Sequence, residues 1–104
     1  MTGDDVRTEL QRVVDRLRSM PLTRLATPCD GYPSRAACAR ALAQRLADRG
    51  ADLGGWSRHT VPDAGDAAVG DQVAVTAADL LALPLDDDEL RALTTDLRAV
   101  RLTL

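Results

Sequence analysis

The segment DDDELRALTTDLRAVRLTL, residues 86–104, decides the fold class. Its apolar residues return at intervals of three and four, the spacing that places side chains on one face of an α-helix. Asp86 occupies the position of an N-cap residue and Glu89 follows at the third helical position, so a helix is expected to begin directly after Asp86. Its expected buried stripe consists of Leu90, Leu93, Leu97, Val100 and Leu104.

Upstream of this helix, residues 69–83 fit two patterns. The valines, alanines and leucines of this segment recur at helical spacing, but Val73 and Val75 also alternate as in a strand. Since a single strand would have no partner in this chain, we expect a helix. Thr76 and Asp79 can also form a variant of the capping box, which would start that helix late.

Two further helices are expected in the first half of the chain. Residues 4–19 carry apolar residues at helical spacing and end just before Pro21. Ser34 is expected to cap a second helix that runs to about Arg49, with Gly50 as the residue that terminates it. The expected buried stripe of that helix is Cys38, Ala41, Leu42, and either Leu46 or the aliphatic stem of Arg45.

Residues 51–68 form the longest irregular stretch, rich in glycine and aspartate. Such a segment either packs over the core, here through Trp56 and Val61, or forms a lid. Four amphipathic helices joined by connections that contain proline or glycine predict an all-α protein, a four-helix bundle that forms a single helical domain over residues 1–104.

The charge balance bears on partners. All 13 basic residues are Arg and they are outnumbered by 16 acidic residues, giving a net charge of -3, so nucleic-acid binding is not expected. No apolar run approaches membrane-spanning length and the N-terminal residues lack the features of a secretory leader, so a soluble, cytoplasmic protein is expected. Cys29 and Cys38 are then expected to be reduced. One His and two Cys do not complete a zinc site, and no metal or cofactor is predicted.

Three segments resemble the DinB-like four-helix proteins, and are most similar to the N-terminal domain of mycothiol-dependent maleylpyruvate isomerases. Residues 14–21 (VDRLRSMP) resemble the end of the family's first helix, and residues 27–35 (TPCDGYPSR) resemble the Thr-Pro-Cys-Pro-Gly-Trp segment that leads into its second. Residues 73–80 (VAVTAADL) resemble the family's Val-His-x-Trp-Asp-Leu segment. In the second segment Asp30 replaces Pro, Tyr32 replaces Trp, and the family's Arg is kept as Arg35.

The resemblance implies a short, degenerate member that lacks the metal histidines. In the family these histidines face the bundle centre, and their positions correspond to Arg40 and Thr76 in this chain. Arg stays protonated and offers no lone pair to a metal. The only His, His59, lies in the irregular stretch and matches neither position. The resemblance therefore implies a metal-free protein.

No catalytic set is predicted, and each candidate ligand-binding residue also has a simpler interpretation. His59 is either a general base or an exposed loop residue, and Trp56 either stacks on a ligand or plugs the open end of the bundle. Arg35 and Arg40 either hold an anion together or form ordinary salt bridges, and Thr76 is a candidate only through the resemblance. Cys29 is either a thiol with a lowered pKa or a small buried residue.

The leading functional prediction is a non-catalytic helical protein that acts by self-association, as a homodimer, or by binding another protein. The alternative is a small-molecule or thiol-ligand binder, or an enzyme, that uses a bundle cavity around Arg40, Thr76 and Cys29. A packed centre with Arg40 paired to an acid favours the first prediction, and an open cavity around Arg40 favours the second. Asp79 is the expected partner of Arg40, since it follows Thr76 on the facing helix.

Overall fold

The structure is a computed structural model that describes residues 3–104. Met1 and Thr2, the first residues of the expected domain, lie outside the described range. Within it the protein is all-helical, which confirms the predicted all-α class. The elements are α1 (Gly3–Ser19), α2 (Leu22–Leu25), α3 (Arg35–Gly54), the 3₁₀ turn η1 (Asp66–Ala68), α4 (Val69–Leu81) and α5 (Asp87–Thr103).

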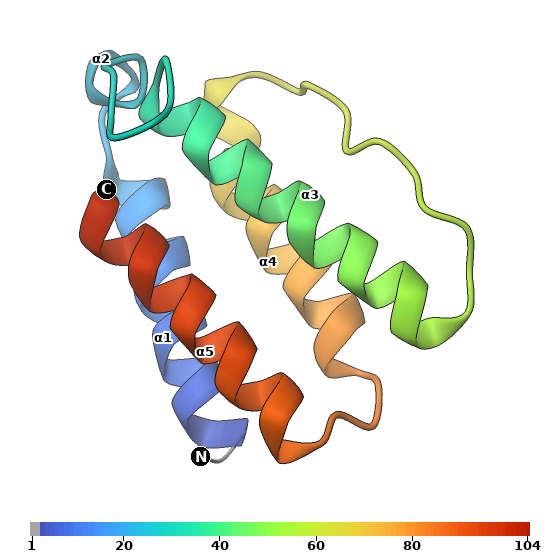
Figure 1. Ribbon diagram of the computed structural model, residues 1–104. Coiled ribbons are helices and arrows are strands. Elements are labelled where there is room, and N and C mark those ends of the chain that lie inside the picture. The colour runs from blue at the N-terminus through green and yellow to red at the C-terminus, as the bar shows by residue number, and fades with distance from the viewer. Residues whose placement is uncertain (1–2) are drawn as a thin grey trace.

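The four long helices lie side by side, with α1 and α5 running in one direction and α3 and α4 in the other (Figure 1). α1 packs against α5 and α4, and α3 packs mainly against α4. Because α3 and α4 are parallel, the coil of residues 55–65 must return along the length of the molecule to reach the start of α4 (Figure 1). This coil is the longest connection among the described residues.

Side-chain caps begin two of the helices as predicted. Ser34 Oγ accepts a hydrogen bond from the Ala37 amide at 2.9 Å, and Asp86 Oδ1 accepts one from the Glu89 amide at 2.8 Å. Both caps satisfy amides that have no partner inside the helix. The predicted helix from Asp4 to Ser19 is also confirmed, one residue longer at its start.

The predicted end of the second helix was wrong. α3 continues through Gly50 to Gly54, and the residue that terminates it is Gly55, whose φ of 77° is left-handed. Gly50 serves packing, since a Cβ there would lie 3.3 Å from the Trp56 ring and 3.9 Å from the Leu80 Cα atom. Residues 51–54, expected to be irregular, are therefore helical.

The ambiguous segment is a helix, as expected, and the alternative of a late start at Thr76 was wrong. α4 begins at Val69, and Thr76 lies within it with its hydroxyl donating to the Gln72 carbonyl at 2.8 Å. The alternation of Val73 and Val75 reflects opposite environments on one helix, because Val73 is buried and Val75 is 61% exposed.

Small aliphatic side chains make up the core. In α5 most of the predicted stripe is buried, and Leu90 packs partly buried against it. In α3 Ala41 is only half-buried and Arg45 is exposed, while Ala39 and Ala43 are fully buried, so the buried face is broader than predicted. The best-covered large side chains are Leu25, Leu42, Leu97, Val6, Val13, Val69 and Val73.

Candidate functional site

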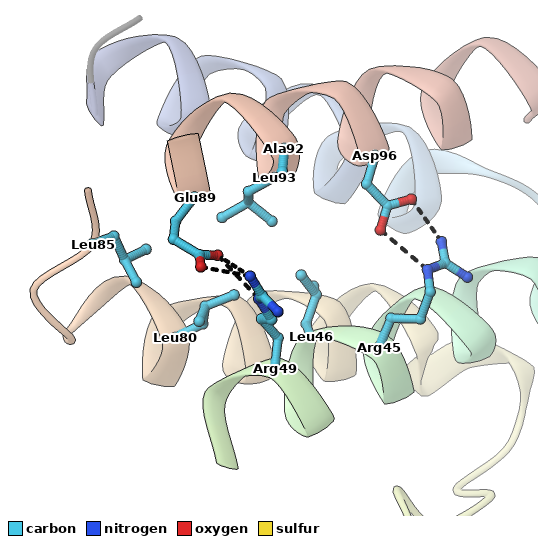
Figure 2. Close-up of a pocket in the computed structure, with 9 residues that line it drawn as sticks. All are labelled: Arg45, Leu46, Arg49, Leu80, Leu85, Glu89, Ala92, Leu93 and Asp96. Atoms are coloured by element: carbon cyan, nitrogen blue, oxygen red, sulfur yellow. Dashed lines mark hydrogen bonds and ion pairs between the residues drawn. The ribbon is translucent and has the colours of Figure 1, made fainter. Parts of the chain in front are cut away.

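A small cavity lies between α3, α4 and α5 (Figure 2). Its volume is about 170 Å³, and its floor is apolar. Two arginine–carboxylate pairs cross from α3 to α5 at its rim (Figure 2). The lining residues are Arg45, Leu46, Arg49, Leu80, Leu85, Glu89, Ala92, Leu93 and Asp96.

Each rim arginine binds a carboxylate through two of its nitrogens. Arg45 donates from Nε and Nη2 to the two Asp96 oxygens at 3.1 and 2.9 Å, and this hydrogen bonding raises the Arg45 pKa above its usual value. Arg49 donates from Nε and Nη2 to Glu89, which raises the Arg49 pKa in the same way. These guanidinium groups stay charged, so they cannot act as acids or bases.

The cavity does not match the one expected for the small-molecule alternative. None of Arg40, Thr76 and Cys29 lines it. Its volume lies below the roughly 300–1,000 Å³ typical of small-molecule pockets. An ionic ligand would also have to displace a bidentate ion pair.

A second, open hollow brings together two of the predicted site residues, His59 and Thr76. It lies between the coil and α4, has a volume of about 290 Å³, and has Val75 on its rim. Apolar side chains dominate its walls. The complete lining is His59, Val61, Pro62, Ala68, Asp71, Gln72, Val75 and Thr76.

The coil is held against α3 and α4 by two glutamines. Gln44 of α3 donates to the His59 carbonyl at 3.0 Å and accepts from the Val61 amide at 2.8 Å. Gln72 of α4 donates to the Pro62 carbonyl at 2.6 Å. Val61 is buried, which agrees with the first alternative for this segment, whereas Trp56, the other residue expected to pack over the core, is 43% exposed. The hollow therefore has a fixed wall.

His59 and Thr76 form no acid–base pair in this hollow. The His59 side chain is exposed and has no ion pair with any carboxylate of residues 3–104. The Thr76 hydroxyl is occupied by carbonyls of its own helix. Neither arrangement activates a nucleophile.

Arg40 does not pair with Asp79, so the predicted partner was wrong. Arg40 Nη2 lies 3.2 Å from Asp63 Oδ1, in the coil, and 3.5 Å from Asp66 Oδ1, at the start of η1. The Arg40 side chain is only 24% exposed, whereas Asp79 is exposed. The guanidinium reaches the segment that covers α3 rather than the facing helix, because the coil approaches α3 on the face that carries Arg40.

Arg35 and Trp56 are placed apart from Arg40 and from each other. Arg35 donates to the Leu104 carbonyl at 3.0 Å and to Thr27 Oγ1 at 2.6 Å, and so joins the end of α5 to the turn before α3. It shares no anion site with Arg40. The Trp56 ring is 43% exposed and lies against Gly50 and Gly54 near the end of α3.

The two thiols lie at the start of α3. Cys38 is 2% exposed, as predicted for a core residue, and burial together with the neighbouring Cys29 raises its pKa to about 11. The half-buried Cys29 directs its Sγ to the Ser34 carbonyl at 3.9 Å. A raised pKa suppresses the thiolate, so Cys38 is not a nucleophile near neutral pH.

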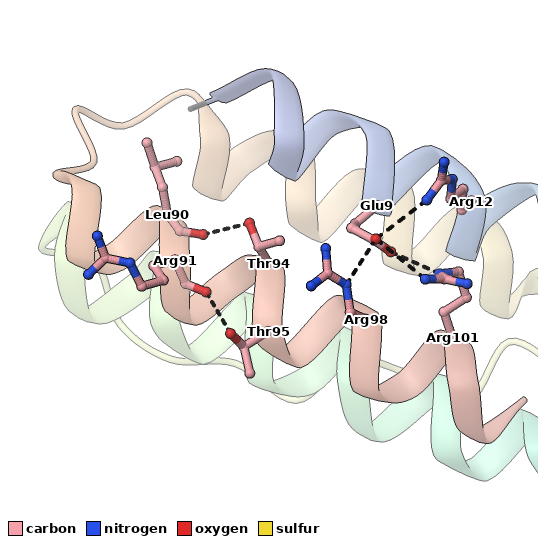
Figure 3. Close-up of polar contacts among 8 residues, drawn as sticks. All are labelled: Glu9, Arg12, Leu90, Arg91, Thr94, Thr95, Arg98 and Arg101. Carbon is pink, nitrogen blue, oxygen red and sulfur yellow. Dashed lines mark hydrogen bonds and ion pairs between the residues drawn. The ribbon is translucent and has the colours of Figure 1, made fainter. Parts of the chain in front are cut away.

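Sequence reasoning missed one ionic cluster, at Glu9 (Figure 3). Glu9 is 3% exposed and accepts from Arg98 Nε at 3.2 Å and Arg101 Nε at 2.9 Å, with Arg12 Nη1 at 3.6 Å. The hydrogen bond from Arg101 has the largest effect and, together with that from Arg98, keeps the Glu9 pKa below its usual value, although burial acts to raise it. The sequence does contain a signal for this cluster: Glu9 occupies a position of the apolar stripe of α1, between Val6 and Val13.

Comparison with protein-family models, with curated proteins and with solved structures finds no match. Within residues 3–104, no group of three or more His, Cys, Asp or Glu residues is placed to hold a metal ion. None of the helices there has the length and apolar character needed to cross a bilayer.

Proposed function

We propose that this protein is a non-catalytic helical module that acts by binding protein, first of all a second copy of itself. The observation that supports this proposal is the open hollow on α4 with the exposed Val75 beside it. A protruding apolar side chain next to an apolar hollow is a self-complementary surface. In a two-fold dimer the same patch is used by both copies, so each Val75 can enter the hollow of the other.

Charge also permits this pairing. The hollow carries one carboxylate, Asp71, and one imidazole, His59. Asp71 accepts two hydrogen bonds from Arg18, at 3.0 and 2.7 Å, so its charge is already balanced within the chain. Two copies facing each other through this patch bring no unbalanced charges of the same sign together.

The environment of Arg40 supports a binding role over the cavity-based alternative. Its ion pairs with Asp63 and Asp66 hold it at the coil, and the small cavity between α3, α4 and α5 lies elsewhere. We also propose kinship with the DinB-like four-helix proteins, as a metal-free member. Four long helices, and the segment of residues 27–35 that leads into α3 with Ser34 as its cap, are consistent with that kinship.

Sedimentation equilibrium at high micromolar concentration tests the dimer. We expect a dimer for the parent chain and a monomer for Val75→Asp, because a charge in an apolar interface leaves an unpaired buried group. Leu102→Asp is the matched control: Leu102 is 72% exposed, lies on α5 away from the hollow, and should leave the dimer intact.

Two results would overturn this proposal. One is a monomeric parent chain at high micromolar concentration. The other is a dimer that Leu102→Asp dissociates and Val75→Asp does not, which would place the interface on the opposite helix pair. Circular dichroism of each variant checks that the helices are retained.

A further inference from the structure

Arginines gather where α1 meets the C-terminal half of α5. A hollow of about 520 Å³ is lined there by Arg12, Arg16 and Arg101, together with Asp15 and Leu102. Figure 3 shows Arg12 and Arg101 approaching Glu9 from the two helices. The hollow therefore lies directly beside the buried carboxylate.

The local charge is opposite in sign to that of the whole chain. Arg98 also binds Glu9, so Glu9, its arginine partners and the residues that line the hollow together contribute four guanidinium groups and two carboxylates, those of Glu9 and Asp15. Two positive charges remain, on a chain whose net charge is -3. A surplus of like charge held on two rigid helices is unfavourable unless an anion or solvent ions balance it.

Glu9 positions the arginines but does not use all of their N–H donors. Its two oxygens are taken by Arg98, by Nε and Nη2 of Arg101, and by Arg12 at 3.6 Å. A guanidinium has five N–H donors, so Arg12 and Arg101 keep donors for a ligand. Glu9 is thus a positioning residue that holds two guanidinium groups at one side of the hollow.

Arg16 is a third arginine at the hollow and lies outside the Glu9 network. It lines the hollow but has no ion pair with any residue of the range 3–104, and Asp15 beside it accepts a hydrogen bond from Gln11 at 2.7 Å. A purely structural Glu9 network accounts for Arg12, Arg98 and Arg101 but not for Arg16.

The chemistry of the hollow fits a compact dianion with an apolar body. Planar guanidinium groups bind phosphate oxygens through paired N–H donors, and three of them surround one hollow. Leu102 at its edge is 72% exposed and offers an apolar contact beside the charged site. An extended polyanion is disfavoured because the rest of the chain is acidic.

We propose that this hollow binds a phosphate monoester, with the phosphate on Arg12, Arg16 and Arg101 and the apolar part of the ligand against Leu102. The same chemical group occurs in soluble metabolites and in the headgroup of phosphatidic acid. The proposal is independent of the dimer, which uses α4 and the coil.

Amide NMR at constant ionic strength, in chloride buffer, tests the soluble source with phenyl phosphate and inorganic phosphate. We expect saturable shifts at millimolar concentrations in residues 12–16 and 98–102, with phenyl phosphate binding more tightly. Arg16→Gln should weaken binding at least about tenfold, since a charge-assisted hydrogen bond is lost. Leu102→Ala should remove only the preference for the phenyl ester.

Co-sedimentation with phosphatidylcholine vesicles, with and without phosphatidic acid, tests the lipid source. Binding only to the vesicles that contain phosphatidic acid, lost in Arg16→Gln, would support the site and assign the lipid as its ligand.

Arg7→Gln is the matched control for both arms. Arg7 is exposed on the same helix, has no ion pair within residues 3–104 and does not line the hollow, so this variant should bind like the parent. The absence of saturable binding in both arms would overturn the proposal. So would an equal loss in Arg7→Gln and Arg16→Gln, because the effect would then be one of net charge alone. Arg16 takes no part in the Glu9 network, so Arg16→Gln should fold normally, and its melting temperature checks this.

Discussion

Glu9 joins the first and last long helices through a single carboxylate. It is nearly inaccessible to solvent because guanidinium groups cover it, although Arg12 and Arg98 are themselves more than half exposed. Solvent screens such contacts, so the cluster is worth less than a fully buried ion pair. Its main effect is to fix the register of α1 on α5.

Replacement of Glu9 by Gln should lower the free energy of unfolding by about 1–2 kcal/mol at neutral pH, because two charge-assisted hydrogen bonds become weaker neutral ones. The pH dependence has a definite sign. Arg101 lowers the Glu9 pKa below 4.5 in the folded protein. The stabilisation that ionised Glu9 contributes is therefore fully present above pH 4.5 and is lost as the pH falls through the folded pKa.

Urea unfolding of both chains at steps from neutral to acid pH measures this effect. The difference between parent and Glu9→Gln should shrink as the pH falls below 4.5. A difference that stays constant over the acid range would mean that the Glu9 contacts are not ionic. Asp4→Asn, an exposed acid on the same helix, is the control and should change stability little.

Residue roles were predictable where the cause is local. Ser34 and Asp86 were identified as caps because an N-cap bonds an amide only three residues away. The partner of Arg40 was missed because a helical register shows which face a residue occupies but not which segment covers that face. The two ion pairs of Arg40 depend on the path of the coil, which Gln44 of α3 and Gln72 of α4 hold in place.

At the scale of elements, the end of α3 shows how one residue type can serve two purposes. Glycine was expected to stop the helix at Gly50. Gly50 and Gly54 instead leave room for the Trp56 ring, and only Gly55 has the left-handed backbone of a terminator. Composition cannot separate these uses, because both depend on what lies next to the missing Cβ. The type of α4 was predictable because a single strand would have had no partner, and the bounds of α5 were predictable from its N-cap and its periodicity.

Gly54→Ala should displace the Trp56 ring from α3. The added Cβ would lie 1.8 Å from Trp56 Cζ3, so the ring must swing into solvent. Trp56 is the only Trp, and its fluorescence emission should move to longer wavelength. Unfolding should show a small net change, since the helix gains about 1 kcal/mol from the removal of Gly and loses the ring contact.

Gly55→Ala is the contrasting variant for the same reporter. A Cβ there meets nothing within 4 Å, but the φ of 77° is strained for Ala. It should destabilise the protein by roughly 1–2 kcal/mol while leaving the emission unchanged. A Gly54→Ala protein with parent-like emission would show that the ring does not rest on α3 in solution.

For the whole molecule, the helical class was predictable and the arrangement of helices was not. Four amphipathic segments require a shared core, whichever order they pack in. The parallel pairing of α3 with α4 requires a coil long enough to return along the molecule (Figure 1). In the sequence this coil could be recognised only as an irregular stretch, which does not show the path that it takes. The Glu9 surface was hidden for the same reason, since it forms only when α1 and α5 are neighbours.

Stability should not depend on a bound metal. The chain has one His, and within residues 3–104 no cluster of three metal-binding side chains exists. Purified protein should therefore keep its melting temperature when a chelator is added, and elemental analysis should find no stoichiometric zinc or nickel. A melting temperature lowered by the chelator, and by His59→Ala to the same extent, would contradict this prediction.

The position of α1 has a consequence for synthesis on the ribosome. The main partners of α1 are α4 and α5, and the first of these begins 50 residues after α1 ends, at Val69. At translation rates of about 5–20 residues per second, the apolar face of α1 stays uncovered for roughly 2–10 seconds. Val6, Val13, Val14 and Leu17 are then open to chaperones or to neighbouring nascent chains. The nascent chain can close this core only after α4 and α5 have both left the exit tunnel.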